Sequence, residues 1–430
     1  MIPQRLRARL ARMSSSSLAG RTLVLSLGRG SSQFLALVAI VITARYYSPA
    51  DFGAVGVVMS IAQFLAMLSS LRFENMALAT PAGEARDAYF RLAYLSVAAS
   101  TGLGLAVVAG VVFVFPDNPH HWLLWWVVPA IPLISLGTVV LPAQLVAMGA
   151  SGRASLALAA FGLVSAVLQV ATLIRPGVGL LLGARVLGYA VAVAVCLGPL
   201  LPFLRRTRWR ERPGRALLAP AYPEVVFGSQ TQIVNTLLFQ LPIYAAAAMG
   251  YAADAGAYWL AFNLFIAPYI VISGSFRALL QNVLLTHRAN NGDMYAFFRR
   301  ATLFAVPVAA VATALSMTLI PLFIDIVLGN EWRTAVVLGL IMSVLLFALI
   351  VQTPVVAAST ALGIQRSEFV HNVLQLAAGA AGFLAVLAAG GDFVWAFAGY
   401  AAGRFIVCLL FAVYVLALLR RRRSPDAVGA

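Results

Sequence analysis

Long apolar runs separated by short polar turns make up most of the chain. Each run is long enough to cross a bilayer as a helix, which takes about 20 residues. We identify twelve of them, at residues 22–44, 53–80, 89–115, 122–147, 154–174, 178–204, 222–248, 255–285, 296–322, 334–361, 368–390 and 393–419. Because only helices and closed barrels satisfy every backbone polar group in lipid, the pattern predicts an all-α polytopic membrane protein with twelve transmembrane helices.

The composition agrees with this prediction. Of 430 residues, 62% are hydrophobic and only 10% are charged, which excludes an ordinary soluble domain. The formal net charge of +16 could suggest a nucleic-acid partner, but the charge lies in short segments between the apolar runs. Membrane topology explains that distribution better, and we expect no nucleic acid to bind.

The basic residues, all of them arginine, give the orientation of the chain. They gather in the two terminal segments and in alternate loops, whereas Arg45, Arg175 and Arg333 are the only ones in the opposite loops. The positive-inside rule then predicts that both termini are cytoplasmic, in a bacterial plasma (inner) membrane. Six tryptophans near the predicted outer ends are typical of an interfacial aromatic belt; they are Trp122, Trp125, Trp126, Trp259, Trp332 and Trp395.

Two halves of six runs resemble each other. Asp51-Phe-Gly-Ala54 at the first outer turn matches Asp254-Ala-Gly-Ala257, and Gly183-Ala-Arg185 matches Ala402-Gly-Arg404. An even number of spans per half makes the copies parallel, so we expect two parallel six-helix lobes around a central cavity. The predicted divisions are a basic N-terminal segment, an N-terminal lobe, a basic linker, a C-terminal lobe and a basic tail, at residues 1–21, 22–204, 205–221, 222–419 and 420–430.

Polar residues form stripes at helical spacing in three of the predicted spans. The first span carries Ser26, Arg29 and Gln33 among others, and the second carries Ser60, Gln63, Met67, Ser70 and Glu74. The seventh repeats the pattern with Gln232, Asn235 and Thr236. Three such stripes favour a water-lined cavity; the alternative is hydrogen bonding between helices in a dry interface.

Ionisable side chains inside membrane helices are rare and usually mark a wet path or a partner. Five arginines qualify, at positions Arg29, Arg72, Arg185, Arg277 and Arg404. The alternative is snorkelling, in which a long arginine near a helix end reaches the headgroups. Arg72 and Glu74 are two residues apart and cannot share one face of a continuous helix, so they form no ion pair within it.

Other polar features have structural explanations or remain open. Ser48-Pro-Ala-Asp51 predicts a helix start, with a serine cap, proline at the first position and a carboxylate at the third. His371 lies on a polar face with Glu368, Asn372 and Gln375, where proton relay is one alternative. No metal-ligand spacing, cofactor motif or disulfide framework is present in the sequence.

Two stretches of the first 80 residues resemble the Wzx-type oligosaccharide flippases of the multidrug/oligosaccharidyl-lipid/polysaccharide (MOP) exporter superfamily. They are Ala44-Arg-Tyr-Tyr-Ser-Pro-Ala-Asp-Phe-Gly53, and Leu71-Arg-Phe-Glu74 with the downstream Pro81. The second is similar to the family's Arg-aromatic-Glu stretch, with Phe73 where the family usually has tyrosine. Beyond these residues the likeness extends over all twelve spans only through hydropathy and the repeat.

The resemblance implies a transporter and not an enzyme, with an isoprenoid-pyrophosphate-linked oligosaccharide as substrate. We expect arginine to supply forked donors for the pyrophosphate. The candidate substrate-binding residues are Arg29, Gln33, Arg72, Arg277, Arg404 and Arg185, and Glu74 is the candidate for ion or proton coupling. The candidate cavity-lining residues are Ser26, Gln63, Ser70, Gln232, Asn235 and Thr236.

The expected mechanism is alternating access, in which the glycan headgroup passes from the cytoplasmic to the outer leaflet for surface polysaccharide export. Membrane lipids, a polysaccharide polymerase and glycosyltransferases are the expected partners, and no cofactor or metal is expected. A lipid II flippase and a drug/cation antiporter of the same superfamily remain alternatives. A membrane polysaccharide polymerase or ligase should carry a large outer loop with catalytic residues, whereas the predicted outer loops are only a few residues long.

Overall fold

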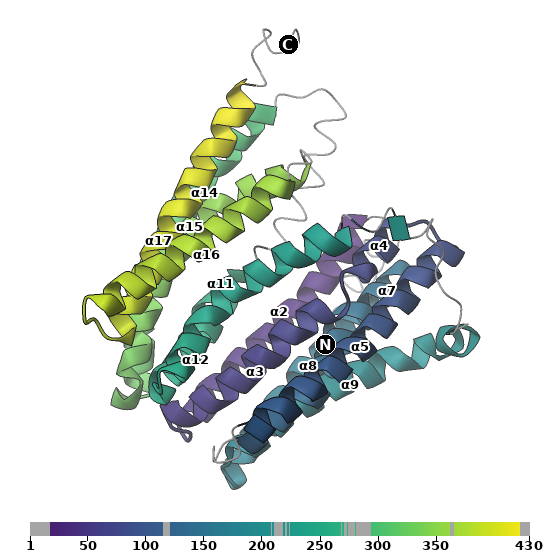
Figure 1. The fold of residues 1–430 in the computed structure, drawn as a ribbon, viewed down its shortest axis with the longest axis horizontal. Helices are drawn as coiled ribbons and strands as arrows, with labels where there is room; N and C mark the ends of the chain where they lie inside the picture. The colour runs from purple at the N-terminus through teal and green to yellow at the C-terminus, as the bar shows by residue number, and fades with distance from the viewer. Residues whose placement is uncertain are drawn as a thin grey trace, which may run out of the picture. The chain divides into compact units, whose positions relative to one another are not determined.

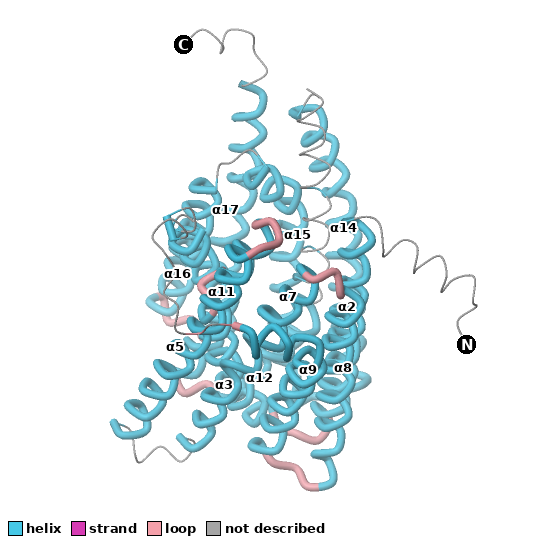
Figure 2. The backbone as a smooth tube through the Cα atoms, turned by 90° about the vertical axis from the view of Figure 1, so that its right-hand side faces the viewer, coloured by secondary structure: helices cyan, strands magenta, loops and turns pink. Residues whose placement is uncertain are grey.

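All regular elements in the described part of the chain are helical. The computed structural model describes residues 18–114, 121–207, 209, 218–219, 222, 224–267, 269–270, 273, 280, 294–361 and 365–421. Figure 2 shows helices joined by short loops throughout these residues. The all-α fold class predicted from the sequence is confirmed.

Nine helices in the described residues are long and apolar enough to cross a membrane. They span Pro49–Ser69, Glu84–Val114, Trp122–Ala147, Ser151–Ile174, Val178–Arg206, Tyr295–Ile324, Asn330–Ala357, Arg366–Ala388 and Phe393–Arg420. The predicted spans 22–44 and 222–248 are not among these nine, and residues 268, 271–272, 274–279 and 281–285 of the predicted span 255–285 lie outside the described residues, so the count of twelve stays a prediction.

The chain divides into two compact units. The first contains residues 1–47 and 54–233, and the second contains residues 48–53 and 234–430. The boundary between them falls inside the helix Ser229–Ala248. Each unit has a buried apolar cluster of its own.

In the first unit, helix α8 is central: α2 and α9 both pack along it. α4 and α5 pack against each other, α5 also packs against α6, and α4 also packs against α7. The elements are α2 (Leu18–Ala44), α3 (Pro49–Ser69), α4 (Phe73–Ala79), α5 (Glu84–Val114), η1 (His121–Trp126), α6 (Val127–Ser135), η2 (Leu136–Val140), α7 (Leu141–Ala147), α8 (Ser151–Ala171), η3 (Thr172–Ile174), α9 (Val178–Arg206) and η4 (Glu224–Gly228).

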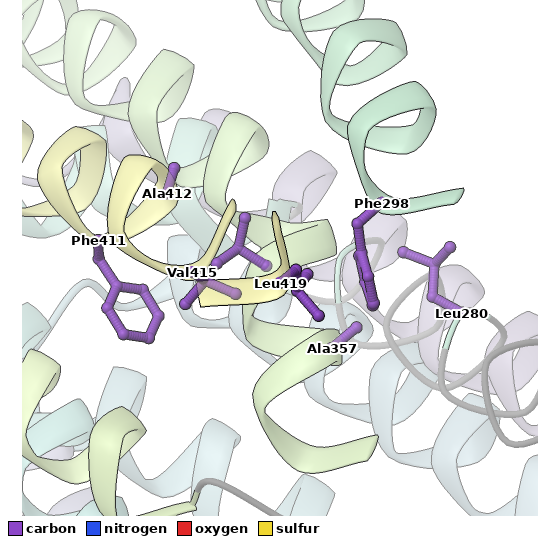
Figure 3. Close-up of a cluster of buried hydrophobic side chains, with 8 residues drawn as sticks. Leu280, Phe298, Ala357, Phe411, Ala412, Val415 and Leu419 are labelled. Atoms are coloured by element: carbon purple, nitrogen blue, oxygen red, sulfur yellow. The ribbon is translucent and has the colours of Figure 1, made fainter. Parts of the chain in front are cut away.

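In the second unit, α17 packs along both α15 and α16, and α14 packs along α15 (Figure 1). The elements are α11 (Ser229–Ala248), α12 (Ala252–Ala261), η5 (Phe262–Ile266), α14 (Met294–Val327), η6 (Asn330–Trp332), α15 (Arg333–Ala361), α16 (Gln365–Ala388) and α17 (Phe393–Arg421). Apolar side chains from α14, α15 and α17 gather in a core cluster that includes Phe298, Ala357 and Phe411 (Figure 3).

The first turn of α3 belongs to the second unit and begins with a capping box. The Ser48 hydroxyl accepts from the Asp51 amide at 3.2 Å, and the Ser48 amide donates to Asp51 Oδ2 at 3.1 Å. This reciprocal pair satisfies two backbone donors that a helix start leaves free. The helix start predicted at Ser48-Pro-Ala-Asp51 is confirmed.

The two repeated outer-turn motifs meet within the second unit. A Cβ added at Gly53 would lie 2.1 Å from the carbonyl oxygen of Ala252, and one at Gly256 would lie 1.7 Å from that of Pro49. Only glycine allows the two backbones to approach this closely.

Two of the tryptophans do not fit the predicted interfacial belt. Trp122, Trp125 and Trp395 are exposed, but Trp259 and Trp332 are each 1% exposed. Trp332 packs edge-on against Phe52, with ring centroids 5.2 Å apart. The belt prediction is wrong for this pair, because packing inside the second unit removes both rings from the surface.

Candidate functional site

The Arg72-Phe-Glu74 stretch does not lie on a continuous helix. α3 ends at Ser69 and α4 begins at Phe73, and between them Leu71 and Arg72 adopt left-handed backbone angles, with φ of 48° and 60°. A left-handed residue other than glycine costs roughly 1–2 kcal/mol, and such strain concentrates at functional sites. The predicted unbroken span 53–80 is wrong here.

The break also corrects the polar stripe predicted for the second span. The 4-residue step from Ser70 to Glu74 assumed helical phase, but two left-handed residues intervene. Ser70 is 3% exposed and Glu74 is 6% exposed, so both are buried. The face that Glu74 occupies is therefore set by α4, independently of α3.

Arg72 is held inside the first unit. Its Nη1 donates to the carbonyl oxygen of Gly228, at the end of η4, at 3.2 Å. With the Asn75 amide oxygen turned toward it, Nε and Nη2 of Arg72 both donate to that oxygen at 3.0 Å. The side chain is half-buried, and it links the start of α4 to the segment that leads into α11.

Glu74 is buried, at 6% exposed, and has interaction partners within the protein. α4 packs against α5 and α7, and the neighbouring core includes Phe73, Tyr89 and Phe90. A buried carboxylate in such surroundings is a common candidate for proton or cation binding, but it also occurs in structural networks. Its role in coupling stays a prediction.

Arg29 lies on a different side of α2 from the helix contact. The contact face uses Gly28 and Ser32: a Cβ at Gly28 would lie 2.5 Å from Ser155 Oγ, and one at Gly162 would lie 2.4 Å from the Cα of Ser32. Successive residues on a helix are about 100° apart, so the residue after each contact position turns away. Arg29 is accordingly exposed, and Gln33, which follows Ser32, is half-buried.

The other polar stripe residues are divided between interior and surface. Gln63 is half-buried and hydrogen-bonds Tyr189 of α9, which is the interhelical bonding that the sequence left open. On α11, Gln232 and Thr236 are half-buried and Asn235 is exposed. The side chain of Ser26 and the whole of Arg277 lie outside the described residues.

Arg185 is buried between α8 and α9. Its Nε donates to Gln169 Oε1 at 3.1 Å, and Gln169 Nε2 in turn donates to Ser165 Oγ at 2.9 Å. The side chain is 9% exposed. In this conformation Arg185 contributes to packing between two helices, and its predicted contact with substrate is untested.

Arg404 is 2% exposed and lies in the interior of the second unit. Its Nη1 donates to the carbonyl oxygen of Leu238 at 2.7 Å, and Tyr400 OH donates to the same oxygen at 2.7 Å. Proline at position 242 has no N–H, so it cannot satisfy the carbonyl four residues earlier. Arg404 and Tyr400 thus replace the helical hydrogen bond that Pro242 removes from α11.

The Arg404 guanidinium also rests on aromatic rings. Its Cζ lies 4.7 Å from the centroid of Phe239 and 5.6 Å from that of Tyr400. Such cation–π contacts help to hold an arginine away from water. The predicted role of Arg404 in substrate binding is not tested by this arrangement, but its structural role is direct.

A buried polar network adjoins Arg404. His371 Nε2 lies 3.0 Å from Gln352 Oε1 and 2.8 Å from Gln375 Nε2, and the Cys408 thiol donates to Gln375 Oε1 at 3.2 Å. His371 also stacks on Phe411, with centroids 3.9 Å apart. The network connects α15, α16 and α17.

Sequence reasoning identified His371 and Gln375 but missed Tyr400, Gln352 and Cys408. One signal was available: Tyr400, Arg404 and Cys408 recur at four-residue intervals and therefore share a face of α17. Gln352 lies beside Pro354 on α15 and had no such signal.

The chain is similar in fold to solved MOP superfamily transporters. A multidrug resistance MATE family transporter of this superfamily, in an inward-facing conformation, has a TM-score of 0.66 and 16% identity, covering 95% of this chain and 100% of that one. A MOP superfamily transporter from Pyrococcus furiosus has a TM-score of 0.63 and 16% identity, covering 96% and 97%.

A mutant of the Vibrio cholerae MATE transporter VcmN has a TM-score of 0.62 and 15% identity, covering 96% of this chain and 99% of that one. Neither a family model nor a curated protein sequence matches the chain. At these identities the similarity concerns the backbone arrangement. The chain therefore has the all-helical, multi-pass fold of MATE transporters of the MOP superfamily.

Proposed function

We propose that the chain is a flippase for an isoprenoid-pyrophosphate-linked oligosaccharide. It moves the glycan headgroup from the cytoplasmic to the outer leaflet of a bacterial inner membrane, with both termini in the cytoplasm, and so supplies surface polysaccharide synthesis. The lipid tail stays in the bilayer while the headgroup passes through the protein by alternating access. The protein acts as a transporter and catalyses no bond change.

The observation that carries this proposal is the exposed Arg29 on α2. The opposing contacts at Gly28 and Ser32 fix α2 against α8 and keep the arginine at the surface of the first unit. An exposed cation at membrane depth is expensive unless an anion or water meets it. A pyrophosphate is a doubly charged group whose oxygens match the donor geometry of arginine.

Charge supports the same substrate class. The chain has 30 basic and 14 acidic residues. The Pyrococcus furiosus neighbour is described as a MOP superfamily transporter whose binding pocket has reverse polarity, suggesting a different function. Binding pockets on this fold are therefore not all of one polarity, and the arginines within the spans of this chain favour an anionic substrate.

Transport by purified protein in lipid vesicles tests the proposal. The substrate is a fluorescent isoprenoid-pyrophosphate oligosaccharide, and flipping is measured as the gain in accessibility to an added glycosidase. We expect Arg29→Ala to slow flipping about 10- to 100-fold, the equivalent of losing one charge-assisted hydrogen bond. Arg29→Lys retains the charge and should recover part of the rate.

Arg175→Ala provides the matched control, because Arg175 is an exposed arginine in a predicted outer loop. It should flip substrate at the wild-type rate. Equal rates for wild type, Arg29→Ala and Arg175→Ala would remove Arg29 from the site. Absence of flipping by the wild type in active vesicles would refute the proposed substrate.

A drug/cation antiporter is the second candidate, because solved structures with this fold include a multidrug resistance transporter. Ethidium efflux from the same vesicles distinguishes the two functions. An antiporter should use a carboxylate for the cation, and Glu74 is the candidate coupling residue in either case. A lipid II flippase differs only in the glycan, so lipid II belongs in the same assay.

A further inference from the structure

His371 is a titratable side chain that the proposed substrate path does not use. It is 2% exposed, seven residues into α16, about 9 Å along the helix from its first residue. Gln352 and Gln375 both engage its Nε2. Among the described residues, none hydrogen-bonds its Nδ1.

The groups around His371 leave its charged form poorly compensated. α16 packs on α15 and α17. In α15 the only titratable residue is Arg333, at its first position, and Gln352 is neutral. On α17, the Cys408 thiol bonds Gln375, which in turn contacts His371, and Arg404 lies one helical turn from Cys408.

Two titratable neighbours of the ring remain. Glu368 is buried one turn earlier on α16 itself. Tyr414 stacks on Phe411, the ring that covers His371 and that Figure 3 shows at the edge of the apolar cluster. Glu368 is therefore the one acidic side chain among these neighbours in the described residues.

We propose that His371 is a proton-binding site of the second unit, and that proton binding there weakens the hold of Arg404 on the Leu238 carbonyl of α11. The incoming proton comes from water and binds a ring nitrogen lone pair, so the ring gains one positive charge and a second N–H. The coupling between the two residues is reciprocal, as for any two linked binding events.

Two features of this conformation oppose the added proton. The second N–H finds no acceptor at Nδ1 among the described residues, and a buried donor without a partner is costly. The new charge also repels the Arg404 guanidinium in a medium of low dielectric constant. Proton binding therefore favours another arrangement, in which Arg404 has moved away from His371 or Nδ1 has reached an acceptor such as Glu368.

Movement of Arg404 would act on α11. Arg404 and Tyr400 are the donors to the carbonyl that Pro242 leaves without its helical partner. If Arg404 withdraws, the Leu238 carbonyl retains only the Tyr400 hydroxyl, and α11 is less firmly held around Pro242. Proton binding at His371 would thus lower the local stability of α11, the helix that begins the second half of the chain.

One part of this inference rests on the proposed transport function: the role of the proton as the ion coupled to transport. The binding event itself is measured without any transported substrate. Failure of the flipping assay would therefore leave proton binding at His371 intact, and absence of proton binding would leave the lipid-linked substrate standing.

Histidine NMR on the full-length protein in lipid nanodiscs measures the proton directly. The chain has four histidines, so ¹⁵N-histidine labelling gives few signals, and His371→Gln identifies the one of interest. We expect that signal to titrate at a lower pH than the signals of exposed histidines, because the two features above oppose the added proton. Arg404→Met should raise the proton affinity of His371 about tenfold or more, moving its midpoint up by about one pH unit.

Two controls separate the charge of Arg404 from general disturbance. Arg404→Lys keeps the positive charge and should leave the midpoint near that of the wild type. Arg420→Met removes an exposed arginine at the far end of α17 and should also leave it unchanged. Equal midpoints in Arg404→Met and Arg420→Met, or no titration of His371 at any pH at which the protein stays folded, would overturn the proposal.

Hydrogen exchange of α11 provides a second measurement that needs no Arg404 variant. In wild type, amide exchange in residues 234–248, corrected for intrinsic chemical rates, should increase as the pH falls through the His371 midpoint. In His371→Gln that increase should disappear. The same pH dependence in both proteins would overturn the link between His371 and α11, even if the Arg404 variants do not fold.

Discussion

The contact between Arg404 and the Leu238 carbonyl allows us to predict how substitution of Arg404 changes the free energy of unfolding of the second unit. Arg404→Met removes a hydrogen bond from a charged donor to the Leu238 carbonyl, made at 2.7 Å. Such bonds contribute about 1.5–3 kcal/mol, and the contact with Phe239 adds about 0.5–2 kcal/mol. Release of a buried charge opposes this loss, so the single substitution does not isolate the hydrogen bond.

Pro242→Ala provides the missing comparison. Alanine at position 242 supplies the N–H that can bond Leu238 through the helix itself, so the carbonyl no longer depends on Arg404. Desolvation of the guanidinium and its contact with Phe239 are common to both backgrounds and cancel in a double-mutant cycle. We expect Arg404→Met to cost about 1–2 kcal/mol less in the Pro242→Ala background.

The free energy of unfolding is measured in mixed micelles by titration with a denaturing detergent. Pro307→Ala is the matched control, because Pro307 interrupts α14 in the same unit and its freed carbonyl belongs to Leu303, on another helix. Arg404→Met and Pro307→Ala should be additive within about 0.5 kcal/mol. An equally small coupling between Arg404→Met and Pro242→Ala would refute the idea that Arg404 replaces the helical hydrogen bond of Leu238.

Three further predictions concern other parts of the chain. Gly162→Val should lower the unfolding midpoint, because a Cβ there would lie 2.4 Å from the Cα of Ser32, whereas Gly152→Val on the same helix meets nothing within 4 Å and should have little effect in thermal unfolding. Ser48→Ala should destabilise the start of α3 by about 1 kcal/mol and Ser48→Asn much less, as measured by the free energy of unfolding. Burial, and secondarily the charge of Asp392, raises the pKa of Asp254 above its ordinary value of 3.8, so Asp392→Asn should lower that pKa in an infrared titration of the carboxyl band. Because the folded pKa is raised, Asp254 destabilises the protein as the pH rises above 3.8, and Asp254→Asn should flatten the pH dependence of stability just above that pH.

Long-range packing explains why sequence reasoning located the arginines but not their partners. Arg404 and Leu238 are 166 residues apart, and Arg72 reaches a carbonyl 156 residues away. Spacing along one helix indicates a shared face, but it says nothing about which distant backbone atom lies opposite. The same limit applies to Trp332, which the sequence placed at an interface and the structure buries against Phe52.

The left-handed backbone angles at Leu71 and Arg72 could not be predicted from the sequence either. Nothing in Ser70-Leu-Arg72 indicates a break, since the stretch contains neither glycine nor proline. The left-handed angles at Leu71 and Arg72 are held by packing of α4 against α5 and α7 and by the hydrogen bond from Arg72 to Gly228. Tertiary contacts can stabilise a conformation that the residues disfavour by themselves.

The sequence by itself determined the properties that depend on local patterns. Twenty-residue apolar runs require helices in lipid, and the Ser48–Asp51 spacing begins a helix because both partners lie within one turn. Only the tertiary structure decided what the ionisable and polar residues do. Arg29 stays exposed because Gly28 and Ser32 take the helix contact, whereas Arg404 is buried because Pro242, on another helix, leaves a carbonyl that needs a donor.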